Sequence, residues 1–404
     1  MQVAVIGGGA AGFFAAIAVK ENHPAATVTL FEKSKRLLAK VRISGGGRCN
    51  VTNACDTIEQ LAAAYPRGGK ALKKAFRLFD NRHAMHWFES RGVPLVVQED
   101  GCVFPASQNS QSIIDCLFGQ AKKCQVRIET GMGVTAIRPL DGRLSLDFAP
   151  PGAAARVFDK VIVTTGGCPK RHNLQWLEDL GHKIETPVPS LFTFNMPTEP
   201  VTALMGIVVE KTLVAIQGSR LKADGPLLIT HWGMSGPAIL KLSAFGARLL
   251  SERDYRFNIQ VNWVNVPRHD VVMADLKNIA EHHPQKLLTS IRPYDLPDRL
   301  WRYLLEKGGL PAQKKWSELG NKGLNKLVEV LSNDVYAVQG KTTFREEFVT
   351  CGGISLESVD PTTLQSRVCN NLYFAGELLD IDGITGGYNF QAAWTTGYIA
   401  GKLQ

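Results

Sequence analysis

The sequence lacks several features that would assign a protein to a class at once. Its eight cysteines form no CxxC pair and have no histidine at metal-ligand spacing, so free thiols and no metal site are expected. No apolar run approaches the ~20 residues that a membrane span needs. The first strand-like run begins at Gln2, which leaves no room for a signal peptide. We therefore expect a protein of the reducing cytoplasm with no membrane partner.

Composition argues against disorder and against a repeat architecture. Hydrophobic residues make up 45% of the chain and charged residues 21%, as in ordinary soluble globular proteins, and no low-complexity tract or long-period repeat is present. A chain of 404 residues exceeds what one compact core usually holds. Two or three domains are therefore expected.

The net charge of +9 is unevenly spread along the chain. Residues 1–189 carry 24 Lys/Arg against 16 Asp/Glu, residues 190–345 carry 20 against 14, and residues 346–404 carry 2 against 7. A basic body suits a phosphate-rich cofactor, a carboxylated substrate or RNA. One predicted helix concentrates basic side chains on one face, which is either a solvated face or an RNA contact. These residues are Lys70, Lys73, Lys74 and Arg77, with Arg67 and Arg82 nearby.

The N-terminal segment "QVAVIGGGAAGFFAAIAVKENHPAATVTLFEK" predicts a strand, a turn, an alanine-rich helix and a second strand. Gly7 allows the tight turn, Gly9 lets a pyrophosphate reach the backbone, and Gly12 permits close packing of helix on strand. Glu32 ends the second strand, where it is placed to accept hydrogen bonds from ribose hydroxyls. This is a dinucleotide fingerprint in its required context, and it does not distinguish NAD from FAD.

Two distant segments resemble other parts of one nucleotide domain. The stretch "NNLYFAGELLDIDGITGGYNFQAAWTTGYIAGKL" predicts a strand over 372–375, a glycine-bearing loop and a helix from about Asn389. It resembles the C-terminal flavin-binding segment of the glutathione-reductase-type FAD folds, in which an acid follows the last strand and the next helix N-terminus faces the flavin. The stretch "KVIVTTGGCP" resembles the strand and turn by which those folds re-enter the cofactor domain. Together the three matches favour FAD over NAD.

Four stretches then carry a more specific resemblance. "ISGGGRCNVTN", "VFPASQNSQSIID", "LLITHWGMSGPAIL" and "GYNFQAAW" together resemble the bacterial BaiN/YhiN-type NAD(P)/FAD-dependent oxidoreductases, also described as aminoacetone-oxidase-like flavoproteins. That family includes a ribosomal RNA dihydrouridine synthase. One departure is visible: such sequences commonly have a Leu-Gly-Arg-Lys run where this chain has Leu37-Leu38-Ala39-Lys40, with Arg42 further on. The arginine contact of that loop therefore stays open.

The resemblance implies an α/β fold built on a discontinuous, glutathione-reductase-type FAD-binding Rossmann-like domain. This domain takes residues 1–189 and 346–404. It is interrupted by a β-barrel-like domain, residues 190–266 and 333–345, and by a small helical domain, residues 267–332. Short alternating runs after Ser190 and helical spacing after Pro267 agree with that order.

The predicted cofactor site is drawn from these motifs, and Ser44 to Gly47 in particular supplies small residues for a nest-like anion site. The expected FAD-binding residues are Gly7, Gly9, Ala10, Ala11, Gly12, Glu32, Lys33, Lys40, Ser44, Gly45, Gly46, Gly47, Arg48, Cys49, Asn50, Val134, Thr165, Gly166, Gly167, Gly376, Glu377, Gly387, Tyr388, Asn389 and Phe390.

Two residues are candidates for catalysis, each with a structural alternative. The Cys49 thiol is a candidate proton donor to a carbon that receives hydride, or it is a buried small side chain. His231, followed by Trp232, either forms a substrate wall or belongs to a turn with a packed indole.

The resemblance implies an FAD-dependent oxidoreductase. Only one GxGxxG occurs, so NAD(P)H is expected as a transient small-molecule hydride donor without a domain of its own. The leading reaction is reduction of a carbonyl-activated C=C bond. A uracil ring in ribosomal RNA is the first substrate class and a steroid enone the second, and the basic charge favours RNA as a partner. An amine oxidase that uses O₂ and a non-catalytic, FAD-stabilised RNA-binding protein stay open as alternatives.

Overall fold

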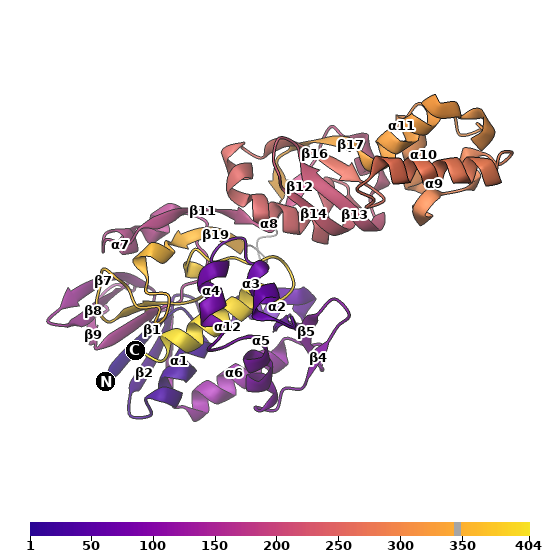
Figure 1. Cartoon of the computed structure of the whole chain (residues 1–404). Helices are drawn as coiled ribbons and strands as arrows, with labels where there is room; N and C mark the ends of the chain where they lie inside the picture. Colours follow the sequence, from indigo (N-terminus) through magenta and orange to yellow (C-terminus); the bar gives the residue numbers. More distant parts are fainter. Residues whose placement is uncertain (343–348) are drawn as a thin grey trace. The chain divides into compact units, whose positions relative to one another are not determined.

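The structure, a computed structural model, describes residues 1–342 and 349–404. Within these residues the chain divides into two compact units (Figure 1). Unit 1 comprises residues 1–190 and 349–404, and unit 2 comprises residues 191–342. Each unit has its own hydrophobic core. Unit 2 is therefore an insertion into the chain of unit 1.

A five-stranded parallel sheet forms the centre of unit 1, in the order β20-β10-β1-β2-β6. Its strands are β1 (Gln2–Ile6), β2 (Thr27–Glu32), β6 (Arg127–Thr130), β10 (Lys160–Val163) and β20 (Leu372–Phe374). The strands are short and mostly apolar, as expected where helices cover both faces of a parallel sheet. The expected parallel α/β fold is thus confirmed, with β20 added at the edge from the C-terminal segment.

The first and last helices of the chain pack closely on one another. Helix α1 (Ala10–Asn22) and helix α12 (Tyr388–Ala400) lie side by side in Figure 1. A Cβ atom at Gly397 would lie 2.8 Å from the Ala11 carbonyl oxygen, and one at Gly401 would lie 2.5 Å from the Ala18 Cβ atom. Glycine is needed at both positions because the two backbones approach so closely. Helix α12 begins at Tyr388, one residue before the predicted start.

Smaller elements surround this sheet and share its core. The remaining helices of unit 1 are α2 (Ala39–Gly47), α3 (Ile58–Ala63), α4 (Gly69–Ala75), α5 (Asn81–Glu89), α6 (Gln111–Lys123) and α7 (Gln175–Glu178). Its smaller sheets are formed by β3 (Thr52–Asn53), β4 (Leu95–Val97) and β5 (Cys102–Pro105), by β7 (Val134–Leu140), β8 (Arg143–Phe148) and β9 (Arg156–Phe158), and by β11 (Ile184–Ser190) with β19 (Val349–Ile354).

Unit 2 combines a seven-stranded antiparallel sheet with four helices. Its strands are β12 (Thr193–Asn195), β13 (Val208–Ile216), β14 (Lys222–Thr230), β15 (Gly233–Ser235), β16 (Arg256–Asn262), β17 (Asp334–Gln339) and β18 (Lys341–Thr342). Its helices are α8 (Pro237–Glu252), α9 (His269–His282), α10 (Asp298–Lys307) and α11 (Gly320–Ser332). Buried Trp263 of the sheet region and buried Trp301 and Trp316 of the helical segment belong to one core. The helical segment is thus continuous with the sheet inside unit 2.

The two crossings between the units run through paired strands. Ser190, the last residue of β11, pairs with Val349, the first residue of β19. On the other side, Thr193 of β12 pairs with Thr342 of β18. The Ser190 hydroxyl donates a 2.7 Å hydrogen bond to the carboxylate of Asp382, which is fully buried. The point where the chain leaves unit 1 is therefore anchored in the core of that unit.

Two sequence expectations concern the chain as a whole. All eight cysteines lie in the described segments, and they are free thiols. Among the helices of residues 1–342 and 349–404, none has the length and apolar character needed to cross a membrane.

Candidate FAD-binding site

The glycines of the N-terminal fingerprint serve packing at two positions and leave open space at the third. Gly7 has a φ of +113°, and a Cβ atom there would lie 2.5 Å from the Thr164 carbonyl oxygen. A Cβ atom at Gly12 would overlap the Gly7 carbonyl oxygen and lie 2.7 Å from Thr164 Oγ1. At Gly9, which precedes α1, a Cβ atom would meet no described atom within 4 Å. Space beside a helix N-terminus is what a pyrophosphate requires.

Glu32 is held at the end of β2 by the backbone of the glycine turn. Its Oε2 atom accepts a 2.8 Å hydrogen bond from the Gly8 N–H, and its Oε1 atom accepts one of 2.9 Å from the Ser34 N–H. A Cβ atom at Gly8 would lie 3.1 Å from Glu32 Cβ and would displace the end of the Leu37 side chain, so a small residue suits this close approach. The carboxylate therefore has the fixed position beside the fingerprint that the sequence predicts. Lys33 adjoins this corner, since a Cβ atom at Gly133, just before Val134, would lie 3.1 Å from Lys33 Cβ.

Replacement of Glu32 tests this corner of the site. We expect Glu32→Ala to weaken FAD binding by about 10- to 100-fold, because charge-assisted hydrogen bonds contribute about 1.5–3 kcal/mol. Glu129→Ala is the matched control, since that carboxylate lies on the neighbouring strand β6 and pairs with Arg156 instead. Titration of the apoprotein with FAD, followed by fluorescence quenching, measures both affinities. Equal FAD affinity in Glu32→Ala and Glu129→Ala would contradict the assignment of Glu32 to the FAD site.

The "SGGGRCN" segment adopts the backbone conformation that its glycines predict. Helix α2 leaves helical geometry at Ser44, and Gly45, Gly46 and Gly47 have φ values of +57°, +68° and +84°. A left-handed run of this kind is accessible to glycine at little cost. A Cβ atom at Gly46 or Gly47 would meet no described atom within 4 Å, so the loop borders open space.

Ser110 holds this loop in place from a distant part of the chain. Its N–H donates to the Gly47 carbonyl at 2.9 Å, and its hydroxyl donates to the Arg42 carbonyl at 2.7 Å. Ser110 lies in the "VFPASQNSQSIID" stretch and is 4% exposed. Sequence reasoning used that stretch only as a mark of resemblance and missed its function as a support for the glycine loop.

Arg48 is engaged within its own loop. Its guanidinium stacks over the Phe104 ring at 4.1 Å from the ring centre. Its Nε atom donates to the Gly45 carbonyl at 3.2 Å and its Nη1 atom to Gln108 Oε1 at 3.3 Å. These contacts make Arg48 a support of the glycine loop in this structure.

Cys49 is completely enclosed, with 0% of its surface exposed. Burial raises the pKa of the Cys49 thiol to about 12, and its hydrogen bond with Ser44 opposes that rise only partly. A thiol that is fully enclosed cannot reach a substrate, so Cys49 is poorly placed to deliver a proton. The structure therefore favours the packing alternative for Cys49.

The segment that follows Cys49 docks onto the N-terminal half of α12. Asn53 Nδ2 donates to the Gly386 carbonyl at 3.3 Å, and Thr52 Oγ1 donates to Gln391 Oε1 at 2.6 Å. The Trp394 indole N–H donates to the Val51 carbonyl at 2.9 Å. The "SGGGRCNVTN" and "GGYNFQAAW" motifs, which are more than 300 residues apart in sequence, are thus directly bonded to one another.

Asn50 offers an unsatisfied group at this junction. Its Oδ1 atom is buried and has no hydrogen-bond partner among the described residues. That atom would lie 2.7 Å from a Cβ atom at Gly387, the residue that precedes α12. A buried acceptor without a partner costs free energy unless a ligand or water satisfies it. A bound group at the α12 N-terminus would have this acceptor beside it.

The third cofactor segment meets the strand β19. Glu377 Oε2 forms a 2.7 Å ion pair with Lys40, and Glu377 Oε1 accepts from the Thr350 N–H at 2.9 Å. A Cβ atom at Gly167 would overlap Glu377 and lie 2.5 Å from Thr350 Oγ1, whereas at Gly166 it would meet no described atom within 4 Å. Thr165, Gly166, Gly167, Gly376 and Glu377 are therefore brought together with Lys40, as the sequence predicts for one site.

Thr350 was missed by the sequence reasoning. It is 0% exposed, and its Oγ1 atom is buried with no partner in the part of the chain that the structure describes. Its position in "TCGG", directly before Cys351, was a usable signal, since a hydroxyl beside a glycine pair suits contact with a phosphate or ribityl group.

Two residues at the start of α12 shape the loop instead of lining open space. The Asn389 side chain accepts from the Gly383 N–H at 2.9 Å and donates to the Gly383 carbonyl at 3.0 Å. The Phe390 ring stacks on Trp394 with an interplanar angle of 14°. Near the same loop, a Cβ atom at Gly376 would lie 2.7 Å from the Cβ atom of Ala11. The side chains of Asn389 and Phe390 thus make contacts within the protein, and their predicted contacts with the cofactor stay a prediction.

His231 belongs to unit 2, whereas the other predicted site residues belong to unit 1. Its exposed ring lies edge-on to Trp232 at 4.4 Å between ring centres. The Trp232 indole N–H donates to Thr193 Oγ1 at 3.1 Å. This arrangement matches the turn with an anchored indole that was the alternative for His231.

The predicted basic face is smaller than the sequence indicates. Lys70, Lys74 and Arg77 are exposed, but Lys73 forms a 2.8 Å ion pair with Glu59. Arg67 is turned inward, where its Nε atom donates to Asp382 Oδ1 at 2.6 Å. Arg67 is therefore part of the interior of unit 1.

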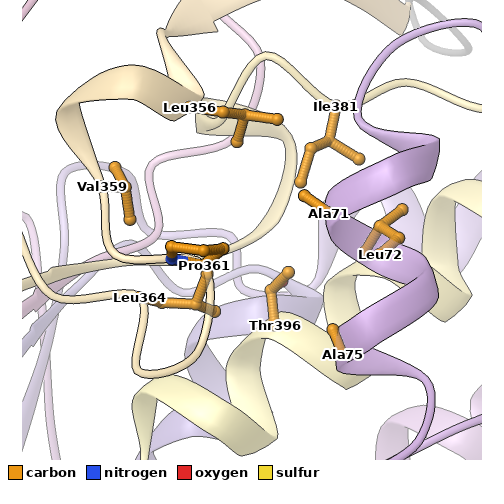
Figure 2. Close-up of a pocket in the computed structure, with 9 residues that line it drawn as sticks. All are labelled: Ala71, Leu72, Ala75, Leu356, Val359, Pro361, Leu364, Ile381 and Thr396. Carbon is orange, nitrogen blue, oxygen red and sulfur yellow. The ribbon is translucent and has the colours of Figure 1, made fainter.

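A separate apolar pocket lies between α4 and α12 (Figure 2). It is lined by Ala71, Leu72, Ala75, Leu356, Val359, Pro361, Leu364, Ile381 and Thr396. None of these residues belongs to the predicted cofactor set. Thr396 nevertheless connects the pocket to the site, because its hydroxyl accepts a 2.8 Å hydrogen bond from the Gly376 N–H.

The residues of unit 1 fit FAD. The glycine positions that border open space come from the N-terminal fingerprint (Gly9), the "SGGGRCN" loop (Gly46 and Gly47) and the "TTGG" turn (Gly166). Helices α1 and α12 both begin beside these groups, and neither carries an acidic residue in its first turn that would oppose an anion. The buried Asn50 Oδ1 and Thr350 Oγ1 atoms have no hydrogen-bond partner among the described residues. The fold and these residues together are those of an FAD-dependent oxidoreductase.

The chain belongs to the HI0933-like protein Rossmann domain family, which matches residues 1–403. It is 28% identical to the 3-dehydro-bile acid delta(4,6)-reductase of Clostridium scindens, over 99% of this chain and 98% of that protein. It is 27% identical to the ribosomal RNA dihydrouridine synthase of Haemophilus influenzae, over 98% of this chain and 96% of that protein. The 3-ketosteroid-delta4-(5alpha)-dehydrogenase of Rhodococcus jostii shares the fold, with a TM-score of 0.52 at 14% identity, over 100% of this chain and 97% of that one.

Proposed function

We propose that the protein uses bound FAD, reduced by NAD(P)H, to saturate a C=C bond activated by a carbonyl group. The observation that carries this proposal is the full-length similarity to both a bile-acid reductase and a dihydrouridine synthase. A uracil ring and a steroid enone look unlike each other, but each presents a C=C bond conjugated to a carbonyl. One chemistry therefore serves both relatives.

The described residues are suited to bind and orient the cofactor for this reaction. Bound FAD provides hydride transfer, and the protein provides binding, orientation and exclusion of side reactions. The fingerprint glycines and Glu32 are proposed for the adenosine end, which is supported by the hydrogen bond from the Gly8 N–H to Glu32 and the open space at Gly9. The glycine loop 45–47 and the N-terminus of α12 are proposed for the other end, which is supported by the hydrogen bond from Asn53, a few residues after the loop, to the Gly386 carbonyl just before α12.

Ribosomal RNA is the substrate class that we favour. Sequence identity alone does not distinguish the RNA substrate from the steroid substrate, since the two relatives are nearly equally similar to the chain. The net charge of +9 suits a polyanion, and exposed Lys70, Lys74 and Arg77 lie in unit 1 together with the FAD site. A steroid acid would gain less from that charge because it carries a single carboxylate.

An anaerobic two-step experiment tests the proposal. The flavin of the holoprotein is first reduced with NADH or NADPH, and its absorbance near 450 nm is then followed after addition of unmodified ribosomal RNA, a 4-en-3-one steroid, or buffer. We expect RNA to restore the oxidised spectrum fastest. Faster reoxidation by the steroid would reverse the substrate order, and reoxidation by neither acceptor would overturn the proposed reaction.

Photoreduction separates the electron donor from the acceptor. If NAD(P)H leaves the flavin oxidised but photoreduced protein is reoxidised by RNA, the proposed donor is wrong and the proposed reaction stands. A salt series adds a second readout, because loss of RNA binding with rising salt counts the phosphates contacted.

A further inference from the structure

A tyrosine and a cysteine form a hydrogen-bonded pair beside the glycine loop before α12. The Tyr388 hydroxyl lies 3.6 Å from the Cys55 sulfur, and the Cys55 thiol donates to Asn53 Oδ1 at 3.2 Å. We propose that Tyr388 donates the proton that accompanies hydride transfer to the substrate, and that Cys55 returns a proton to Tyr388. The inference rests on the proposed function and adds to it the source of the proton.

The position of Tyr388 is fixed by its neighbours. The Tyr65 hydroxyl donates a 2.6 Å hydrogen bond to the Tyr388 carbonyl, and the two rings meet edge-on. A Cβ atom at Gly386 would lie 3.0 Å from Cε2 of the Tyr388 ring, and one at Gly383 would lie 2.9 Å from its Cβ. Two glycines are therefore needed to admit this ring. A hydroxyl held in this way meets the positional demand on a proton donor.

Tyr388 and Cys55 belong to the same junction as the predicted flavin contacts. Asn53 uses one end of its amide for the Gly386 carbonyl and the other for the Cys55 thiol. Gly387, next to Tyr388, lies against Thr52 and the unpaired Oδ1 atom of Asn50. Tyr388 and Cys55 are half-buried, whereas Cys49 is fully enclosed. The pair is thus reachable where Cys49 is not.

The protonation state of Tyr388 suits a donor. Burial raises the pKa of its hydroxyl above the ordinary value, and Cys55, Cys102 and Asp100 act in the same direction. The hydroxyl therefore keeps its proton near neutral pH. The Cys55 thiol, with its sulfur 3.6 Å from the Tyr388 hydroxyl, is placed to return a proton to a phenolate formed there.

The step balances in atoms and electrons. The substrate's C=C bond accepts a hydride, with two electrons, from reduced FAD at the carbon β to the carbonyl, and the flavin is oxidised. The Tyr388 O–H bond breaks and its proton forms the new C–H bond at the α carbon. The phenolate takes the proton of the Cys55 S–H group, and water reprotonates the thiolate. One hydride and one proton are consumed for each saturated bond.

Removal of the Tyr388 hydroxyl is the direct test. In the reduced holoenzyme, we expect Tyr388→Phe to slow reoxidation by the acceptor that serves the wild type by about 10²- to 10⁴-fold, the usual contribution of a general acid. Reoxidation by O₂ needs no proton on carbon and should stay within about twofold of wild type. Tyr398→Phe is the matched control, because it deletes a hydroxyl from the same helix nearly three turns away from Tyr388.

A second measurement tests the contact between Tyr388 and Cys55 in the absence of catalysis. Alkylation of Cys55 by iodoacetamide in the apoprotein, followed by peptide mass spectrometry, should slow by about three- to tenfold in Tyr388→Phe, because the phenol no longer donates to the thiolate. Cys55→Ala should slow acceptor-driven reoxidation and leave the O₂ reaction unchanged.

The outcomes separate the two proposals. Wild-type rates of acceptor-driven reoxidation in Tyr388→Phe would overturn the assignment of Tyr388 and leave the proposed function intact. If RNA and the steroid both fail to reoxidise the wild type, the proposed function fails and this inference fails with it. Equal slowing of the O₂ and acceptor reactions in Tyr388→Phe would show damage to the flavin site and would also overturn the proton assignment.

Discussion

Gly12→Ala is expected to give a protein that no longer retains FAD. The new methyl group would overlap the Gly7 carbonyl oxygen and lie 2.7 Å from Thr164 Oγ1, both of which are fixed parts of the parallel sheet and its first turn. Thr164 Oγ1 donates to the carbonyls of Ile6 and Gly7, so neither atom moves freely. Helix α1 would have to shift away from β1. Such overpacking costs about 1–3 kcal/mol and displaces the helix N-terminus that the pyrophosphate needs.

The measurement is FAD retention after gel filtration, together with the Tm of the apoprotein. We expect at least about a 100-fold loss of FAD affinity and a lowered Tm. Gly119→Ala in α6 is the control, because a Cβ atom there would meet no described atom within 4 Å. Alanine should stabilise that helix by about 1 kcal/mol or less. Full FAD occupancy in Gly12→Ala would contradict the assignment of the fingerprint.

Arg67→Met is expected to cause the largest loss of stability in unit 1. Asp382 is fully buried and forms hydrogen bonds with Arg67 and with Ser190. Without Arg67 the carboxylate would be a buried charge with one neutral hydroxyl as its remaining named partner. Removal of one member of a buried ion pair costs about 3–5 kcal/mol. Arg171→Met, which breaks an exposed pair with Glu178, should cost about 1 kcal/mol or less.

The pH dependence of this loss identifies Asp382 as its cause. Burial raises the pKa of Asp382 above the ordinary value, against the opposing effect of Arg67. A carboxyl whose pKa is raised by folding favours the folded state when it is protonated, and that advantage is lost as the pH rises through its folded-state pKa. Without Arg67 that pKa rises further. The difference in unfolding free energy between wild type and Arg67→Met should therefore shrink from about pH 7 to about pH 5 in urea titrations. A difference independent of pH would contradict this explanation.

The parts of the site that the sequence predicted best are local. The run from β1 through Gly12 to Glu32 combines strand, turn and helix signals within a few tens of residues, and each signal constrains the next. The positive φ values at Gly45 to Gly47 were likewise implied by the glycine cluster itself. The meeting of these segments with Gly376 and Glu377 came from resemblance to a known fold, because no local rule pairs residues so far apart.

The parts that were missed depend on contacts between distant segments. Ser110 and Thr350 look ordinary in sequence, and only the fold brings their hydrogen-bonding groups to the glycine loop and to Gly167. Arg67 was grouped with a basic helix because charge is visible in sequence and burial is not. Cys49 shows the same difficulty, since its 0% exposure is set by residues from several elements.

The insertion of unit 2 has a consequence for the order in which the chain acquires its structure during synthesis. Unit 2 is one continuous stretch, so its sheet and helices are complete before β20 and α12 have been made. Unit 1 cannot be completed until the C-terminal segment has been made, because β20 supplies an edge of its parallel sheet and α12 packs on α1. A folded unit 2 holds β12 next to β18, which lowers the entropy cost of pairing Ser190 with Val349 across the insertion. Because β20 and α12 come late in the chain, the FAD site of unit 1 is complete only after both have been made.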